Sequence, residues 1–284
     1  MKRAEILLIV SAFVAVACPA GEKTRLDAAV YGGAVDYKHS DIKDDAHVSG
    51  IYLYLGHGLN HLLEMEVDRL TIDYSNADVV RQWDLTTVYS HFGLWPWRLR
   101  LGAHAISGDD DVTDGAWTAF LGAHYQHEQT WGAGIDGYLT TYDQYPPSFL
   151  AQQVTVHAGM TLWRGWDHRV QGEVRGHWIH LDNDVGLGQK TFLSVEEHLT
   201  LLAGAWSLSG FMWQGEQAFA VRGDGFVVYS VAEEHTGVFG IALSRSLGRR
   251  DTLELRVSRE TFRHLGLSST VHADSISLLF RHTF

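Results

Sequence analysis

The chain ends in the stretch Ile276-Ser-Leu-Leu-Phe-Arg-His-Thr-Phe284, and this stretch decides the fold. Ile276, Leu278, Phe280 and Phe284 fall on one face of an extended strand, because successive side chains of a strand point to opposite faces. Serine and arginine side chains fall on the other face. An apolar face that ends on a terminal aromatic ring favours a surrounding other than water. The pattern therefore predicts a strand with one apolar and one polar face.

This terminal strand resembles the closing strand of bacterial outer-membrane β-barrel proteins, a porin-like class. His282 departs from the pattern, because that family usually carries Tyr or an aliphatic residue at this place. The alternative is an amphipathic C-terminal strand of some other fold. The resemblance implies that Phe284 is recognised by the outer-membrane assembly machinery, and that outer-membrane lipids and lipopolysaccharide surround the protein in a Gram-negative bacterium.

The first 20 residues are predicted to be a secretory signal peptide. A basic start is followed by an apolar run and by small residues at the expected cleavage site. The run is shorter than the roughly 20 residues that a membrane-spanning helix needs. The domain organisation predicted is therefore a signal peptide at 1–20 and a β-barrel at 21–284. Cys18 lies in the signal segment, and cleavage before it would instead leave a lipidated N-terminus.

Composition excludes several classes of protein. No segment beyond the signal has 18 consecutive apolar residues, which argues against membrane-spanning helices. The formal net charge of -12 argues against nucleic acid as a partner, because a basic patch is needed to neutralise phosphates. The 10 Trp, 11 Tyr and 12 Phe residues are more than a soluble core usually needs, whereas a barrel in lipid uses such residues at the membrane interfaces.

Alternation along the chain predicts an all-β protein, a transmembrane antiparallel up-and-down β-barrel of about 14 strands, with 12 as the alternative. The predicted strands are 24–38, 46–57, 60–74, 79–91, 96–107, 115–128, 131–143, 150–163, 167–182, 190–203, 205–220, 236–247, 251–264 and 271–284.

The connections between these strands alternate between short and long. Connections after even-numbered strands are tight, and those after odd-numbered strands are longer and more polar. Membrane barrels have short periplasmic turns and longer outer loops, whereas a soluble sandwich gives no reason for the asymmetry. The longest outer loop, 221–235, could fold inward, although no segment is long enough to form a plug domain.

Tryptophan placement predicts an aromatic girdle at each membrane interface, because the amphipathic indole prefers the headgroup region. Trp83 and Trp213 are also expected toward the rim of the long loops. The predicted girdle consists of Trp95, Trp97, Trp117, Trp131, Trp163, Trp166, Trp178 and Trp206.

With the apolar face outward, the charged face of each strand is predicted to line the lumen. Two places fit poorly: Glu197 would face lipid unless a bulge near Glu196 resets the register, and 205–220 changes parity around residues 212–214. The predicted lumen-lining residues are Glu64, Glu66, Asp68, Asp84, Arg98, Arg100, His104, His124, Asp136, His157, Arg169, Glu173, Arg175, His177, Glu254, Arg256 and Glu260.

The function predicted from this lumen is a narrow passive channel for small hydrophilic solutes. Glu64, Glu66 and Asp68 form an acidic row nearly opposite Arg169 and Arg175, so a transverse field across the pore is expected. The alternative is that these groups pair into salt bridges and close the lumen as a polar core, because buried charges need partners.

Two further classes of function stay open. An outer-membrane enzyme would use rim groups such as Ser90 with His91 or Ser269 with His272, but neighbours in a strand point to opposite faces, and no hydrolase motif surrounds them. The acidic loop at 109–114 is expected to be solvated rather than to bind a cation. A structural or partner-holding barrel is the other class, in which His57 and His61 would be the metal candidates. No catalytic residue, metal or cofactor is predicted.

Overall fold

The computed structural model describes residues 24–284 apart from 76–78, 129 and 268. The predicted signal peptide, Cys18 included, lies outside the described residues. No helix in the described part of the chain has the length and apolarity to cross a membrane.

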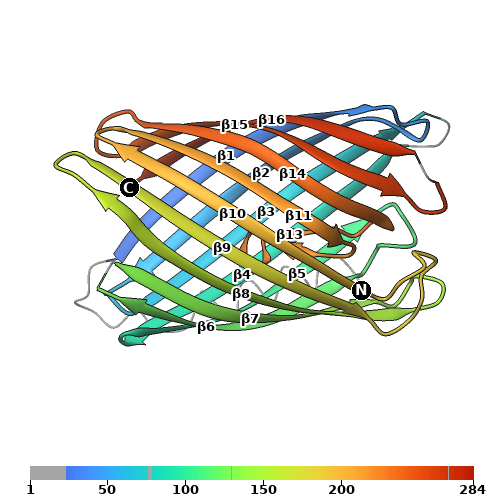
Figure 1. Ribbon diagram of the computed structural model, residues 1–284, viewed down its shortest axis with the longest axis horizontal. Coiled ribbons are helices and arrows are strands. Elements are labelled where there is room, and N and C mark those ends of the chain that lie inside the picture. Colours follow the sequence, from blue (N-terminus) through green and yellow to red (C-terminus); the bar gives the residue numbers. More distant parts are fainter. Residues whose placement is uncertain (1–23, 76–78, 129, 268) are drawn as a thin grey trace.

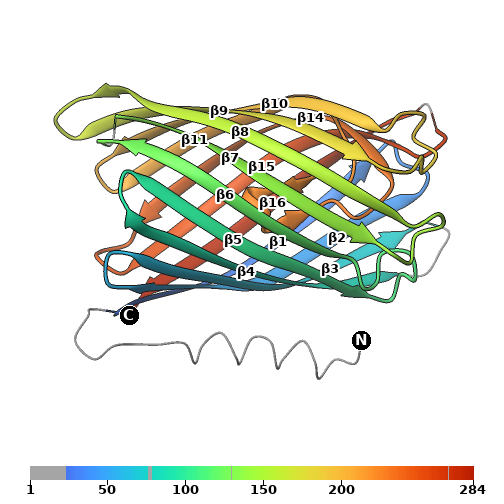
Figure 2. The ribbon, with the colours of Figure 1, turned by 90° about the horizontal axis from the view of Figure 1, so that it is seen from below.

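Fourteen strands of the described residues close into one antiparallel barrel, in which each strand pairs with its neighbours in the chain (Figures 1 and 2). The first strand pairs with the last from Asp27 with Thr283 to Lys38 with His272, and this pairing closes the sheet. The strands are β1 (Thr24–Lys38), β2 (Lys43–His57), β3 (His61–Tyr74), β4 (Val80–Leu94), β5 (Trp97–Gly108), β6 (Trp117–His127), β7 (Trp131–Tyr142), β8 (Phe149–Arg164), β9 (His168–Leu181), β10 (Thr191–Ala203), β11 (Trp206–Gln217), β14 (Glu233–Ser246), β15 (Asp251–His264) and β16 (Thr270–Thr283).

The prediction of 14 strands is confirmed, and every strand end lies within three residues of the predicted one. Two of the three-residue differences, at the end of β11 and the start of β14, make the connection between these strands cover residues 218–232 rather than 221–235. The short turns lie at one end of the barrel, together with the start of β1 and the end of β16, and the long loops lie at the other (Figure 1).

The outer face of the barrel is apolar. Leu99, Leu121 and Val156 keep 42%, 70% and 51% of their surface exposed, whereas the neighbouring Arg100 keeps only 6%. This is the inverse of a water-soluble protein, in which leucine and valine are the buried residues. The surface therefore suits hydrocarbon as the solvent.

The two places where the sequence pattern is irregular, in β10 and in β11, have different structures. The register of β10 runs without a break on both sides, so no bulge rescues Glu197, and its exposed side chain lies between Val195 and Leu199 on the apolar face. In β11 the alternation continues through Trp213 and breaks at a bulge between Gln214 and Gln217.

The eight girdle tryptophans are all exposed. Trp213 lies in the half of β11 that leads to the long-loop end, but it faces the lumen and not lipid. Its side chain is 1% exposed and lies beneath the Arg222 guanidinium, 5.0 Å from the ring centroid. Because Met212 takes the outward position, strand alternation turns Trp213 into the barrel.

Residues 218–232, which we call the inner loop, fold into the barrel instead of standing above it (Figures 1 and 2). The loop contains the short hairpin β12 (Val221–Arg222) and β13 (Val227–Val228), with the 3₁₀ turn η1 (Gly223–Gly225) at its tip. The outer loop that was expected as a candidate for folding inward therefore does so, with both of its bounds shifted by three residues.

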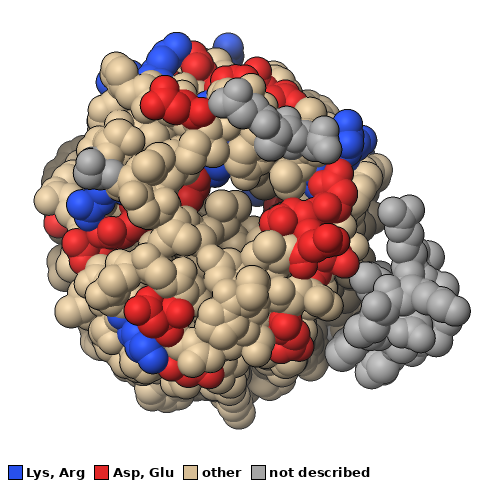
Figure 3. Space-filling model, turned by 90° about the vertical axis from the view of Figure 1, so that its right-hand side faces the viewer, with Lys and Arg blue, Asp and Glu red and all other residues tan. Residues whose placement is uncertain are grey.

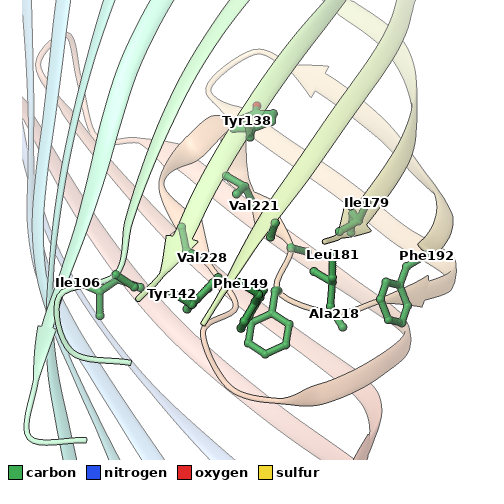
Figure 4. Close-up of a cluster of buried hydrophobic side chains, with 14 of the residues drawn as sticks. Ile106, Tyr138, Tyr142, Phe149, Ile179, Leu181, Phe192, Ala218, Val221 and Val228 are labelled. Atoms are coloured by element: carbon green, nitrogen blue, oxygen red, sulfur yellow. The ribbon is translucent and has the colours of Figure 1, made fainter. Parts of the chain in front are cut away.

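An apolar cluster inside the barrel holds the base of the inner loop (Figure 4). Phe219 packs against Tyr142 and Phe149 with ring centroids 5.0 Å and 4.7 Å away, and the rings of Tyr142 and Phe149 stack at 4.6 Å. Ile179 and Phe192 of the neighbouring wall belong to the same cluster and are fully buried. The described interior thus has an apolar region near β7–β10, a smaller apolar cluster of Phe262, Val271 and Ala273 on β15 and β16, and polar groups between them.

The outward position of Leu121 predicts a large cost for a charge there. In lipid vesicles, Leu121→Arg is expected to lower the free energy of unfolding by about 2 to 4 kcal/mol, because an arginine in mid-membrane has no polar partner. Leu59→Arg, at a 94% exposed site in the turn after β2, is the matched control and should change it by less than about 0.5 kcal/mol. Urea titration monitored by tryptophan fluorescence measures both; equal effects would contradict the membrane orientation.

Candidate functional site in the lumen

The hairpin of the inner loop is joined to the barrel wall by one side-chain amide. Gln153 of β8 donates from Nε2 to the carbonyl of Val221 at 2.7 Å, and its Oε1 accepts from the Val221 N–H at 2.8 Å. Gln153 is 3% exposed, so both groups of its amide are satisfied away from water. The two bonds fix where the hairpin enters the lumen.

The tip of the loop turns through three consecutive left-handed residues, Gly223 (φ 55°), Asp224 (φ 60°) and Gly225 (φ 99°). Glycine adopts this region without steric cost, and aspartate tolerates it better than most residues. At Gly225 space adds a second constraint, because a Cβ atom would lie 2.4 Å from Cζ of Phe120. The local sequence therefore produces a sharp turn that presents Asp224.

Asp224 is held by two arginines from different walls. Arg175 of β9 donates from a terminal nitrogen to Oδ1 at 2.8 Å, and a terminal nitrogen of Arg100 of β5 lies 3.9 Å from the same oxygen. Arg100 also donates to the carbonyl oxygen of Asp224. The loop tip is thus tied to two parts of the wall, β5 and β9, through one residue.

The pKa of Asp224 lies below its ordinary value. Burial in the lumen raises it, but the attraction of Arg175 and then of Arg100, with the hydrogen bond from Arg175, lowers it by more. The side chain keeps 45% of its surface accessible, so water in the lumen screens these interactions. Asp224 is therefore ionised at neutral pH, and its contacts are ionic rather than neutral hydrogen bonds.

Other contacts of the inner loop reach nearly around the barrel. Arg222 donates to Glu196 of β10 at 2.7 Å, Tyr229 to Glu260 of β15 at 2.9 Å, and Ser230 to Gln82 of β4 at 3.2 Å. On the far side, the Phe226 ring lies 5.7 Å from the Tyr52 ring of β2. Only a segment enclosed by the barrel touches all these walls.

Below the loop tip, Asp136 of β7 collects three partners. A terminal nitrogen of Arg100 lies 3.1 Å from Oδ1, Nε2 of His124 lies 3.0 Å from the same oxygen, and Nδ1 of His157 lies 3.7 Å from Oδ2. Room for this cluster comes from Gly122, where a Cβ atom would lie 1.9 Å from Oδ1 of Asp136. Because Gly122 of β6 has no side chain, the Asp136 carboxylate can lie over β6.

The acidic row of β3 is not a bare wall of carboxylates. Tyr52 donates to Glu64, and Tyr31 donates to Glu66. On β4, Asp84 contacts His104 Nε2 at 3.1 Å and accepts two bonds from Gln82 at 2.9 Å. Tyr31, Tyr52 and His104 thus occupy hydrogen-bonding positions of these carboxylates. The prediction of a transverse field assumed that these positions are available to solutes.

Most of the predicted lumen residues contact the inner loop directly or through a partner, so their side chains lie on the inner face of the barrel. Sequence reasoning misses two lumen carboxylates: Asp224 lies in a loop, where alternation gives no direction, and Glu196 was considered only as the place of a possible bulge. The predicted residues linked to the loop directly or through their partners are Glu64, Asp84, Arg98, Arg100, His104, His124, Asp136, His157, Glu173, Arg175, His177 and Glu260.

The remaining predicted residues lie apart from the loop contacts. Arg256 lies over the Phe211 ring at 5.0 Å and 3.9 Å from Glu254. Arg169 has no carboxylate within 4.0 Å among the described residues, and its Nε is buried without a partner. Glu66 and Asp68 lie beside Tyr31, with Asp68 8% exposed.

A cavity of about 460 Å³ occupies the short-turn end of the lumen. Its polar lining comes from β5 to β10 and includes Arg98, His124, His157, Gln171 and Arg175. At the opposite end, Figure 3 shows a hollow near the centre of the long-loop face, with Asp and Glu side chains around it. The polar space of the lumen therefore opens toward both ends.

The groups considered for catalysis or metal binding are arranged as follows. Ser90 is buried, and strand alternation places His91 on the outer face. His57 and His61 pair across their turn, with ring centroids 6.5 Å apart. Among the described residues, two groups have the spacing of metal ligands: His124, Asp136 and His157 in the lumen, and the more exposed Asp45, His47 and Asp73.

Comparison with known proteins identifies the fold. No family model matches the chain, and no curated protein matches it. Among solved structures it is similar to the CymD monoaromatic hydrocarbon channel (TM-score 0.58, 6% identity, 92% of this chain and 88% of that chain). It is also similar to a bacterial polysaccharide outer membrane secretin (0.55, 10%, 91% and 98%) and to a Pseudomonas aeruginosa FadL homologue (0.54, 9%, 92% and 90%). At such identities the likeness concerns the fold, and that fold is the one of bacterial outer-membrane β-barrel proteins.

Proposed function

We propose that the protein is a narrow passive channel for small hydrophilic solutes in the outer membrane of a Gram-negative bacterium, with the inner loop as its constriction. In this proposal lipids and lipopolysaccharide contact the apolar face and its tryptophan girdle. Phe284 is the C-terminal residue that the assembly machinery recognises. Its side chain is 69% exposed, and its N–H donates to the carbonyl of Leu26 at 3.0 Å.

The observation that carries the proposal is the enclosure of polar side chains behind an apolar outer face. A closed structural barrel could be filled by apolar side chains, as the β7–β10 side is. The rest of the lumen instead presents carboxylates, guanidinium groups and imidazoles around polar space at both ends. Such a lining solvates small hydrophilic molecules and ions during passage.

A closed polar core is the second candidate, and one observation favours it. Arg100 and Arg175 are bonded to acidic partners, as buried charges in a sealed lumen would be. The two candidates differ in ion current, because a sealed lumen carries none. The inner loop is the place where they can be separated by mutation.

Removal of the loop tip is expected to enlarge the pore. The N–H of Tyr229 bonds to the carbonyl of Ala220 at 2.9 Å, so Asn-Gly in place of residues 221–228 can close a two-residue hairpin there. Single-channel recordings in planar bilayers should show discrete steps for the wild type and steps several-fold larger for the variant.

Arg256→Gln is the control for that recording, because it changes a lumen charge away from the loop, and its conductance should stay within twofold of the wild type. Absence of steps in both the wild type and the hairpin variant would establish the closed core. Equal conductance of the two would show that the loop is no constriction.

Acid is expected to release the loop tip. Because the folded-state pKa of Asp224 is lowered, its ionic contacts are complete above the ordinary aspartate pKa of about 3.9 and are lost as the pH falls through the lower value. Conductance should therefore stay constant from pH 7 to pH 5 and rise below about pH 4. Asp224→Asn should show the larger conductance already at pH 7 and no acid step. A rise between pH 7 and pH 5 would assign the gating to histidines instead.

A further inference from the structure

Arg98 is a lumen cation without an acidic partner. Its terminal nitrogen lies 2.7 Å from Nδ1 of His124, and among the described residues no carboxylate comes within 4.0 Å of its guanidinium. His124 directs Nε2 toward Asp136 at 3.0 Å, so Nε2 carries the proton and Nδ1 accepts from Arg98. A guanidinium has five N–H donors, so Arg98 keeps donors for a ligand.

The cavity that Arg98 lines contains more cationic than anionic groups. Of the described residues in its lining, Glu173 is the carboxylate, and Arg175 already bonds to it. Arg98 thus faces about 460 Å³ of space without a carboxylate in contact with it, at a volume typical of pockets for small organic molecules. The Phe92 ring, 5.9 Å from the Arg98 guanidinium, offers an apolar surface beside the charge.

We propose that this cavity binds a small organic carboxylate, with Arg98 as its main contact and Arg175 as a second. A planar guanidinium matches a carboxylate in two parallel hydrogen bonds, and Phe92 contacts the apolar body of the same molecule. The inference names a solute class for the proposed channel and rests on that proposal.

A metal ion is disfavoured at the same place, although His124, Asp136 and His157 have suitable spacing. A metal bound at Nε2 of His124 requires a proton on Nδ1, where Arg98 now donates. Arg100 also occupies Oδ1 of Asp136, the oxygen that His124 approaches. Two guanidinium groups beside these ligands repel a cation and attract an anion.

The inner loop competes with the carboxylate for Arg175. Asp224 accepts from Arg175 at 2.8 Å and so already presents a carboxylate to the arginine that lines the cavity. A bound carboxylate that draws Arg175 toward Arg98 weakens this contact. Asp224→Asn should therefore strengthen binding, because the competitor has lost its charge.

Equilibrium binding is the appropriate measurement, because acidic side chains at the long-loop end slow the arrival of anions from that side (Figure 3). Isothermal titration calorimetry of the refolded full chain in detergent micelles uses benzoate as the probe. Benzamide is its neutral isostere, and inorganic phosphate is the anion without an apolar body.

Benzoate should bind the wild type, and benzamide should bind at least about tenfold more weakly. Arg98→Gln should weaken benzoate binding about tenfold or more, Asp224→Asn should strengthen it about threefold, and Arg256→Gln should leave it within twofold. Circular dichroism and the heat-dependent gel shift of each variant show that the barrel has folded.

Three results would overturn the proposal: no heat from benzoate with the wild type, unchanged binding to Arg98→Gln, or phosphate binding more tightly than benzoate. Ion current separates this site from the channel itself. Current without benzoate binding removes the carboxylate site and leaves the channel, whereas binding without current leaves the site in a closed barrel.

Discussion

The structure depends on the need of each backbone N–H and C=O group for a partner inside hydrocarbon. A sheet meets this need only when its first and last strands pair, as β1 and β16 do. Closure then fixes which side chains point inward, because a strand has only two faces. The polar face of the strands is enclosed by the same pairing that turns the apolar face toward lipid.

Enclosed charges create the next requirement, since each one needs a partner or water. The walls supply some partners across neighbouring strands, as Glu64 obtains from Tyr52 and Asp84 from His104. On the walls, Arg100 of β5 and Arg175 of β9 have separate carboxylate partners, Asp136 and Glu173. Asp224 reaches both because it comes from a loop inside the lumen, so the loop satisfies charges that the sheet alone leaves without a common partner.

The strands were predictable because their pattern is local, with a period of two over stretches such as 251–264 that match the structure at both ends. The path of the inner loop was not predictable in the same way. Its contacts join residues far apart in the chain, such as Arg100 with Asp224 and Gln153 with Val221, and alternation carries no information about such pairs. Trp213 faces the lumen by the same local alternation, whereas the contact of Arg222 with its ring depends on the path of the loop.

The attachments at the base and at the tip of the inner loop differ in kind, and this decides whether the tip can move. Phe219 at its base is buried among aromatic rings, and such burial is worth about 1.5 to 3 kcal/mol for one side chain. Asp224 at its tip is held by ion pairs in contact with lumen water, where a single pair is worth about 1 kcal/mol or less. Salt or a competing anion weakens the second attachment and not the first. The tip can therefore leave the arginines while the base stays in place.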